Sequence, residues 1–167
     1  MHKAAFRNKF ATVFEHSAWV ADAVYDTGID KLLEDADSLS ERFASVFMAS
    51  SPERQLTTLR AHPELACALS DPDQLTPDSA LEQAGAGLDQ CSEAELAEFR
   101  RLNDSYSEKF GYPFIIAVKG RDRHQVLGLF RMRLKNDAVM EYQTALYQVC
   151  QIARFRIGDI LNSRHRD

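Results

Sequence analysis

The sequence predicts an all-α fold, a single-domain bundle of about eight helices with a short extended apolar segment at residues 114–118. Apolar side chains recur at helical spacing through most of the chain. Gly and Pro are scarce, at 7 and 5 of 167 residues, which suits long helices better than a many-stranded sheet. The length and the apolar fraction of 45% are typical of one globular domain, so we expect residues 1–167 to form a single domain.

Charge and cysteine usage narrow the class of protein. A net charge of −5 argues against general nucleic-acid binding, which requires a basic face. The longest strongly apolar run, at 114–118, is too short to cross a membrane, and no signal peptide is evident near the start. The three cysteines are far apart and form no CxxC pair, which is typical of a reducing compartment: Cys67, Cys91 and Cys150. We therefore expect a cytoplasmic protein without nucleic-acid or membrane partners.

The first half of the chain predicts four helices. Two apolar stripes repeat every three or four positions, and Gly28 ends the second. A capping box formed by Ser38 and Glu41 predicts the start of the third helix. Ser51 followed by Pro52 predicts the start of the fourth. The stripes consist of Phe6, Phe10, Val13 and Phe14, and of Trp19, Val20, Ala23 and Val24.

The second half predicts further helices around one ambiguous segment. Thr76-Pro77 caps a helix that carries Glu82 and Gln83, and a capping box at Ser92 and Glu95 opens a long helix. An amphipathic helix covers residues 126–134, and the strongest periodic pattern covers residues 142–161. The run 114–118 fits buried extended chain and a buried helical turn equally well, because periodicity does not separate the two.

His62 is the leading candidate for proton transfer. Pro63 disfavours helical geometry at the preceding residue, so His62 is expected at a helix end with its imidazole projecting from a break in the backbone. The free pKa of a histidine lies near the working pH, so the side chain can give or take a proton. The alternative is a helix-terminal histidine that binds a nearby carbonyl.

Glu82 and Gln83 are adjacent and could border the same pocket. Glu82 could hold His62 in one tautomer, and Gln83 could bind an amide or ureido group with one donor and one acceptor. The alternative is a solvated helix surface.

Arg156 lies inside the apolar stripe of the last helix, between Ile152 and Ile160, whereas Arg154 does not. A buried guanidinium requires a carboxylate, backbone carbonyls or an anionic ligand, so a structural salt bridge is the alternative to ligand binding.

Other polar clusters give weaker signals. Arg121, Arg123 and His124 indicate a solvated turn, to which we assign no site. No histidine pair has the i, i+4 spacing of common zinc sites, and no glycine-rich phosphate loop is present, so no metal ligands are predicted. The residues alone lead to a helical domain with a histidine, glutamate and arginine site, but not to a reaction.

Four motifs in order resemble the 2-oxo-4-hydroxy-4-carboxy-5-ureidoimidazoline (OHCU) decarboxylases of urate degradation. The motifs are His62-Pro63-Glu64-Leu65-Ala66, then Ser79-x-x-Glu82-Gln83-x-x-Ala86-Gly87-Leu88, then Asn103-x-x-Tyr106-x-x-Lys109-Phe110-Gly111-Tyr112-Pro113-Phe114-Ile115-Ile116, and finally Glu141-x-x-x-Ala145-Leu146 followed by Ile152 and Arg156. The resemblance covers nearly the whole chain. It implies an all-helical, usually dimeric enzyme that uses no metal or organic cofactor and forms (S)-allantoin from a small ureidoimidazoline substrate.

The resemblance also implies roles for individual residues. His62 would donate the proton, Glu82 would orient His62 and engage the ureido side, and Arg156 would hold an anionic or carbonyl oxygen. The implied substrate-binding residues are Pro63, Ser79, Ala80, Leu81, Glu82, Gln83, Phe114, Ile115, Ile116, Ala117, Val118 and Arg156, with backbone groups acting at 114–118. Cys67 departs from the glycine that is frequent after the first motif.

Two other functions remain open at this stage. One is a lyase or hydrolase that acts on another ureido acid, which a substrate panel would distinguish. The other is a helical interaction module whose histidine, glutamate and arginine form a polar network in the core. A metal-binding bundle is a weaker third possibility.

Overall fold

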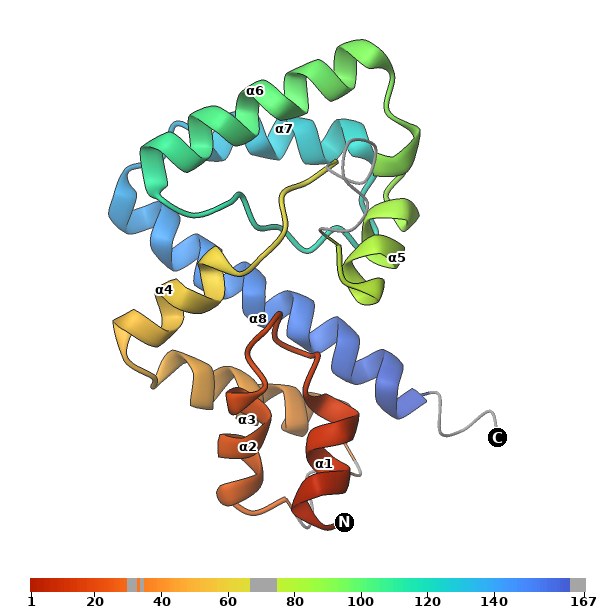
Figure 1. Cartoon of the computed structure of the whole chain (residues 1–167), viewed down its shortest axis with the longest axis vertical. Coiled ribbons are helices and arrows are strands. Elements are labelled where there is room, and N and C mark those ends of the chain that lie inside the picture. The colour runs from red at the N-terminus through yellow and green to blue at the C-terminus, as the bar shows by residue number, and fades with distance from the viewer. Residues whose placement is uncertain (30–32, 34, 67–74, 163–167) are drawn as a thin grey trace. The chain divides into compact units, whose positions relative to one another are not determined.

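The computed structural model describes residues 1–29, 33, 35–66 and 75–162 (Figure 1). Within them lie eight α-helices and the 3₁₀ helix Leu88–Gln90, and none of these residues forms a β-strand. The all-α prediction is therefore confirmed. The chain divides into two compact units, Met1–Ala61 with Leu146–Asp167 (unit 1) and His62–Ala145 (unit 2). Cys67 and the connection at 71–73 lie outside the described residues.

Unit 1 consists of four short helices and most of the last one. Its helices are α1 (Lys3–Phe10), α2 (Trp19–Asp26), α3 (Ala36–Met48), α4 (Pro52–Arg60) and the part of α8 (Ala138–Asn162) from residue 146 onwards. Phenylalanine rings fill the core between α1 and α3, and Phe14 and Phe43 stack with centroids 6.2 Å apart. Val13 and Phe14 lie beyond the end of α1, so the first apolar stripe extends past its helix into a turn.

The start of α3 differs from the prediction. Asp35, not Ser38, is the N-cap residue, and its carboxylate accepts hydrogen bonds from the backbone N–H groups of Asp37 and Ser38. The Ser38 hydroxyl donates to the same carboxylate at 2.5 Å. These hydrogen bonds lower the pKa of Asp35, the Ser38 hydroxyl bond having the largest effect. The predicted capping box was wrong because an acidic cap three residues upstream adds another turn to the helix.

Unit 2 consists of α5 (Pro77–Gly85), the 3₁₀ helix, α6 (Glu93–Phe110), α7 (Arg123–Arg133) and the first residues of α8. The predicted caps are confirmed, since Thr76 accepts from the Ser79 N–H and Ser92 forms a reciprocal capping box with Glu95. Gly111 ends α6 with a left-handed φ of 77°, which glycine adopts without a steric penalty.

Residues 114–118 form an extended buried segment without helical hydrogen bonding. This resolves the ambiguity left by the sequence pattern. Phe114 stacks on Phe130 of α7 with centroids 3.8 Å apart, and Tyr106 of α6 contacts both rings edge-on. The segment is thus held in place by aromatic packing against two helices of unit 2.

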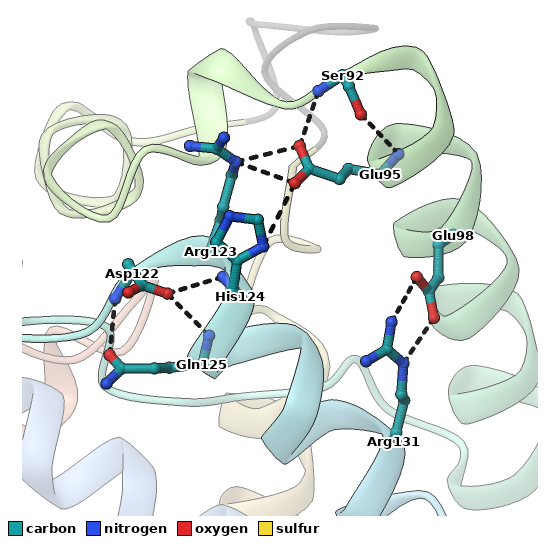
Figure 2. Close-up of polar contacts among 8 residues, drawn as sticks. All are labelled: Ser92, Glu95, Glu98, Asp122, Arg123, His124, Gln125 and Arg131. Atoms are coloured by element: carbon teal, nitrogen blue, oxygen red, sulfur yellow. Dashed lines mark hydrogen bonds and ion pairs between the residues drawn. The ribbon is translucent and has the colours of Figure 1, made fainter.

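Helices α6 and α7 lie side by side and are joined by ion pairs (Figure 2). Glu95 accepts hydrogen bonds from Arg123 Nε at 3.1 and 3.2 Å, and His124 Nδ1 lies 3.5 Å from the same carboxylate. The backbone N–H of Ser92 and the Arg123 side chain hold the pKa of Glu95 below its usual range. The basic cluster predicted as a solvated turn is therefore partly a contact between helices.

A second pair joins the same helices. Glu98 of α6 binds Arg131 of α7 through two hydrogen bonds of 2.7 Å (Figure 2).

Asp122 caps α7 in a reciprocal box with Gln125, a start signal that the sequence reading missed. Arg121 donates to the backbone oxygen of Ala117 at 2.8 Å.

Candidate active site

His62 lies directly after the end of α4, as its position before a proline predicted. The helix ends at Arg60, Ala61 is its C-cap, and His62 is the first residue of unit 2. The side chain is buried, with 9% of its surface exposed, and Pro63 is half-buried. A titratable imidazole therefore begins a short non-helical segment that runs to Ala66.

Two amide side chains bind the backbone of that segment. Gln83 Oε1 accepts a hydrogen bond from the Ala66 N–H at 3.0 Å, and its Nε2 donates to the Glu64 oxygen at 3.3 Å. Asn103 Nδ2 donates to the Leu65 oxygen at 3.0 Å. Gln83 was predicted to bind the substrate, and in the structure its amide oxygen and nitrogen hold the main chain next to His62.

The predicted binding stretch at 79–83 lies on α5 and has two different faces. Ser79 and Gln83 are buried at 5% exposure and lie one turn apart, so they share a face. Leu81 is 75% exposed, Ala80 is exposed, and Glu82 is half-buried. Gln83 therefore binds residues 64 and 66 from the buried face of α5, whereas Ala80 and Leu81 lie on its exposed face.

The extended segment is bound by arginines at alternate residues. Arg133 donates to the Ile115 oxygen at 2.6 Å, and Arg121 donates to the Ala117 oxygen at 2.8 Å. In extended chain the backbone groups of successive residues point to opposite edges. The arginines thus bind the carbonyl oxygens of Ile115 and Ala117, and we expect the backbone N–H and C=O of Ile116 at the opposite edge.

A buried ionic network supports the same segment. Glu141 is fully buried and accepts hydrogen bonds from Arg133 at 2.5 and 2.9 Å and from the Tyr106 hydroxyl at 2.5 Å. Its other oxygen accepts from Asn136 at 2.8 Å. Burial and the hydrogen bond to Glu141 raise the pKa of Tyr106, so its hydroxyl stays protonated and donates. The sequence reading did not identify this network.

Arg156 lies in unit 1, where it has a carboxylate partner. Its guanidinium is 6% exposed and donates to Glu15 at 2.8 Å and to the backbone oxygen of Thr12 at 3.1 Å. Arg154 is exposed, as its place outside the apolar stripe predicted, and it pairs with Asp37. Of the partners that the sequence left open for Arg156, the structure contains a carboxylate and a backbone carbonyl.

Glu64 is a further titratable group beside His62. Partial burial, and the negative charge of Asp104 on α6, raise its pKa above the usual value. No group of three or more potential metal ligands occurs within the described residues. No helix in that part of the chain combines the length and the apolar composition that crossing a membrane requires.

Comparison with known proteins shows which family the chain resembles. The model of the family described as OHCU decarboxylase matches residues 1–158. The chain is 33% identical over 159 residues to a 2-oxo-4-hydroxy-4-carboxy-5-ureidoimidazoline decarboxylase of Haloferax volcanii, covering 95% of this chain and 90% of that protein. The resemblance that the sequence motifs indicated is confirmed.

The chain also resembles two larger proteins, and in each case it spans only part of the larger protein's length. The uric acid degradation bifunctional protein PucL of Bacillus subtilis is 31% identical over 164 residues, and the chain spans 98% of its own length but only 32% of that protein. The crystal structure of an (S)-allantoin synthase superposes with a TM-score of 0.73 at 28% identity, covering 96% of this chain and 51% of the other.

Proposed function

Because the chain belongs to the OHCU decarboxylase family, we propose that it decarboxylates 2-oxo-4-hydroxy-4-carboxy-5-ureidoimidazoline to (S)-allantoin in urate degradation. His62 donates the proton and Glu82 orients it. The observation that carries the proposal is a buried histidine at a helix end, in the family's first motif, on a backbone segment that two amides hold in place. Buried, fixed groups of this kind suit proton transfer in a chosen direction.

The reaction requires an oriented substrate and one proton, and the substrate itself can accept the electron pair that a cofactor would otherwise accept. The carbon that loses CO2 lies next to a C=N bond of the ring, so the released electron pair has an internal sink. The neighbouring carbon then gains a proton on one face, which sets the configuration of the product. His62 supplies that proton, or first polarises the substrate hydroxyl before CO2 leaves.

The remaining binding groups follow from the predicted set. Ser79 and Gln83 hydrogen-bond the ureido or ring amides, with Ala80 and Leu81 completing that stretch, and Pro63 packs against the substrate. Backbone groups of residues 114–118 line the ring, which the extended conformation supports because it directs the N–H and C=O of Ile116 to the edge opposite Arg133 and Arg121. Arg156 holds a substrate oxygen, and its bond to Glu15 fixes the direction of the guanidinium.

We further propose that residues 1–167 form one domain that acts as a homodimer in the cytoplasm. The family model spans both compact units, which supports a single domain. Met132, Val139 and Met140 are more than half exposed, and we expect such exposed apolar side chains to lie at a contact between copies of the chain. Cys91 and Cys150 are free thiols, as expected in a reducing compartment.

The test is a circular-dichroism time course with OHCU generated in situ from urate by urate oxidase and the hydrolase that follows it. The wild-type protein is expected to speed the appearance of the (S)-allantoin signal, and His62→Ala is expected to lower the rate by roughly 10²- to 10⁴-fold. His124→Ala, an exposed histidine of the same unit, is the matched control and should keep its activity.

Two results would overturn the proposal. If wild-type protein leaves the spontaneous racemic decay unchanged, the decarboxylase assignment is wrong, and a panel of other ureido acids or a role as an interaction module becomes the better explanation. If His62→Ala stays folded and keeps full activity, the proton donor is another group.

A further inference from the structure

The Leu65–Ala66 peptide group is bound from both of its edges. Its carbonyl oxygen accepts a hydrogen bond from Asn103 of α6, and its N–H donates to Gln83 of α5, each at 3.0 Å. The bonding atoms of Asn103 and Gln83 come from side chains separated from the segment by 38 and 17 residues. A peptide plane bound at both edges by side chains of two helices cannot rotate without breaking one of these bonds.

This segment needs such support because its conformation is unfavourable by itself. Ala66 has a φ of 59°, in the left-handed region that L-residues other than glycine adopt at a steric cost. The two side-chain bonds offset that cost and select one orientation of the peptide group. Two residues lie between this peptide group and His62. The ring of Pro63 fixes its φ, and the carbonyl oxygen of Glu64 accepts a hydrogen bond from Gln83 Nε2 at 3.3 Å, so the connection to the histidine is short and restrained.

Asn103 is also an unusual residue for a purely structural position. Its side chain is 4% exposed, and its Oδ1 has no hydrogen-bond partner among the described residues, whereas its Nδ2 is bonded. Rotating the amide would place Oδ1 against the Leu65 oxygen, so the orientation is set by the bond to the loop. A buried acceptor without a donor destabilises the fold, which indicates that Asn103 serves another purpose.

We propose that Asn103 is a positioning residue for His62, acting with Gln83 through the Leu65–Ala66 peptide group. We call the hydrogen bonds from Asn103 and Gln83 to this peptide group the clamp. The inference deepens the proposed function and rests on it, since it assigns the clamp a purpose in proton transfer. Asn103 touches neither the imidazole nor the substrate in this role. It fixes the direction of the backbone from which the imidazole projects.

The test is the variant Asn103→Leu, which removes the donor while keeping a side chain of similar length. We expect kcat to fall about tenfold to a hundredfold, because a misdirected proton donor slows the chemical step. KM should change by less than about threefold, because the substrate-binding groups are unchanged. Amide hydrogen exchange at Ala66 should become faster than in the wild-type protein.

Gln55→Leu is the matched control. Gln55 is also buried, at 7% exposure, and donates to the backbone oxygen of Met48 at 3.0 Å, so the variant loses the same kind of bond at the turn between α3 and α4. It should lose stability without a selective fall in kcat or faster exchange at Ala66. A merely structural role for Asn103 predicts the same behaviour in both variants, and that result would overturn the inference.

The two proposals fail in different ways. If the wild-type protein shows no decarboxylase activity, the proposed function is wrong and the clamp loses its catalytic purpose. The exchange rate of the Ala66 amide still reports whether Asn103 holds the segment. If the wild-type protein is active and Asn103→Leu keeps its kcat, the positioning role alone is wrong.

Discussion

Arg133 and Glu141 place opposite charges in the interior of unit 2. Both are almost completely buried, and their hydrogen bonds extend to the Tyr106 hydroxyl, the Asn136 amide and the backbone of Ile115. Removing two charges from water is costly, and their attraction compensates only while both are present with their remaining hydrogen bonds made. The network therefore makes unit 2 sensitive to the loss of either partner.

We predict that Glu141→Leu lowers the free energy of unfolding by about 3–5 kcal/mol, because it leaves the Arg133 guanidinium buried without a counter-charge. The double variant Arg133→Met with Glu141→Leu should lose less than Glu141→Leu alone. Urea unfolding followed by circular dichroism measures both. Glu98→Gln, which weakens the more exposed pair that joins Arg131 of α7 to α6, is the control and should have a much smaller effect. A double variant that is less stable than the single one would contradict the argument.

The same residues indicate how far sequence reasoning reaches at this scale. Arg156 was recognised as buried because it interrupts an apolar stripe, and the structure confirms its burial. Arg133 follows Val126 and Phe130 at helical spacing, so the same test would have found it. Its partner Glu141 could not be identified in the same way, because periodicity places a side chain on one face of a helix but does not identify the residue packed against it.

Helix ends were predictable where the capping chemistry is local. Ser51-Pro52, Thr76-Pro77 and the box at Ser92 each involve residues within one turn, and all three are confirmed. The clamp formed by Gln83 and Asn103 was not predictable, because it joins residues that only the tertiary fold brings together. The extended state of 114–118 was also undecided, since packing against aromatic rings selects it.

The start of α3 gives a prediction at the scale of the element. Asp35→Ala should lower the melting temperature at pH 7 more than Ser38→Ala, because Asp35 accepts two backbone N–H bonds as the true cap. The folded-state pKa of Asp35 is lowered from 3.8, so its stabilising effect is present above that value and is lost as the pH falls through the folded pKa.

Melting curves at pH 7 and at a pH well below 3.8, under the folded-state pKa of Asp35, test this loss of stabilisation. The difference between Asp35→Ala and the wild-type protein should shrink at the lower pH, where the carboxyl becomes protonated. If Asp35→Ala and Ser38→Ala lowered the melting temperature equally at pH 7, the assignment of Asp35 rather than Ser38 as the main capping residue would be wrong.

At the scale of the whole molecule, the exposed apolar side chains concern assembly. Met132 at the end of α7 and Val139 and Met140 at the start of α8 are each more than half exposed. Leu129 and Met132 also line an open groove beside α7. Burying such side chains against a second copy of the chain would be favourable, in proportion to the apolar area removed from water.

We predict that the wild-type protein has the mass of a dimer and that Val139→Glu with Met140→Glu shifts it to a monomer, because two charges would be buried at the contact. Size-exclusion chromatography with light scattering over a range of concentrations gives the masses. Met48→Glu, at an exposed methionine of unit 1, is the control and should leave the dimer intact. A wild-type monomer at every concentration would rule out this assembly.

The extended segment at 114–118 has a consequence for the evolution of the molecule. A ligand that binds the segment at the edge opposite Arg121 and Arg133 would be recognised by main-chain N–H and C=O groups, which every amino acid except proline carries in full. The side chains of the segment face the interior, where volume and shape decide which residues are tolerated. Substitutions there would accumulate under selection for stability, while recognition of the ligand passed unchanged from one sequence to the next.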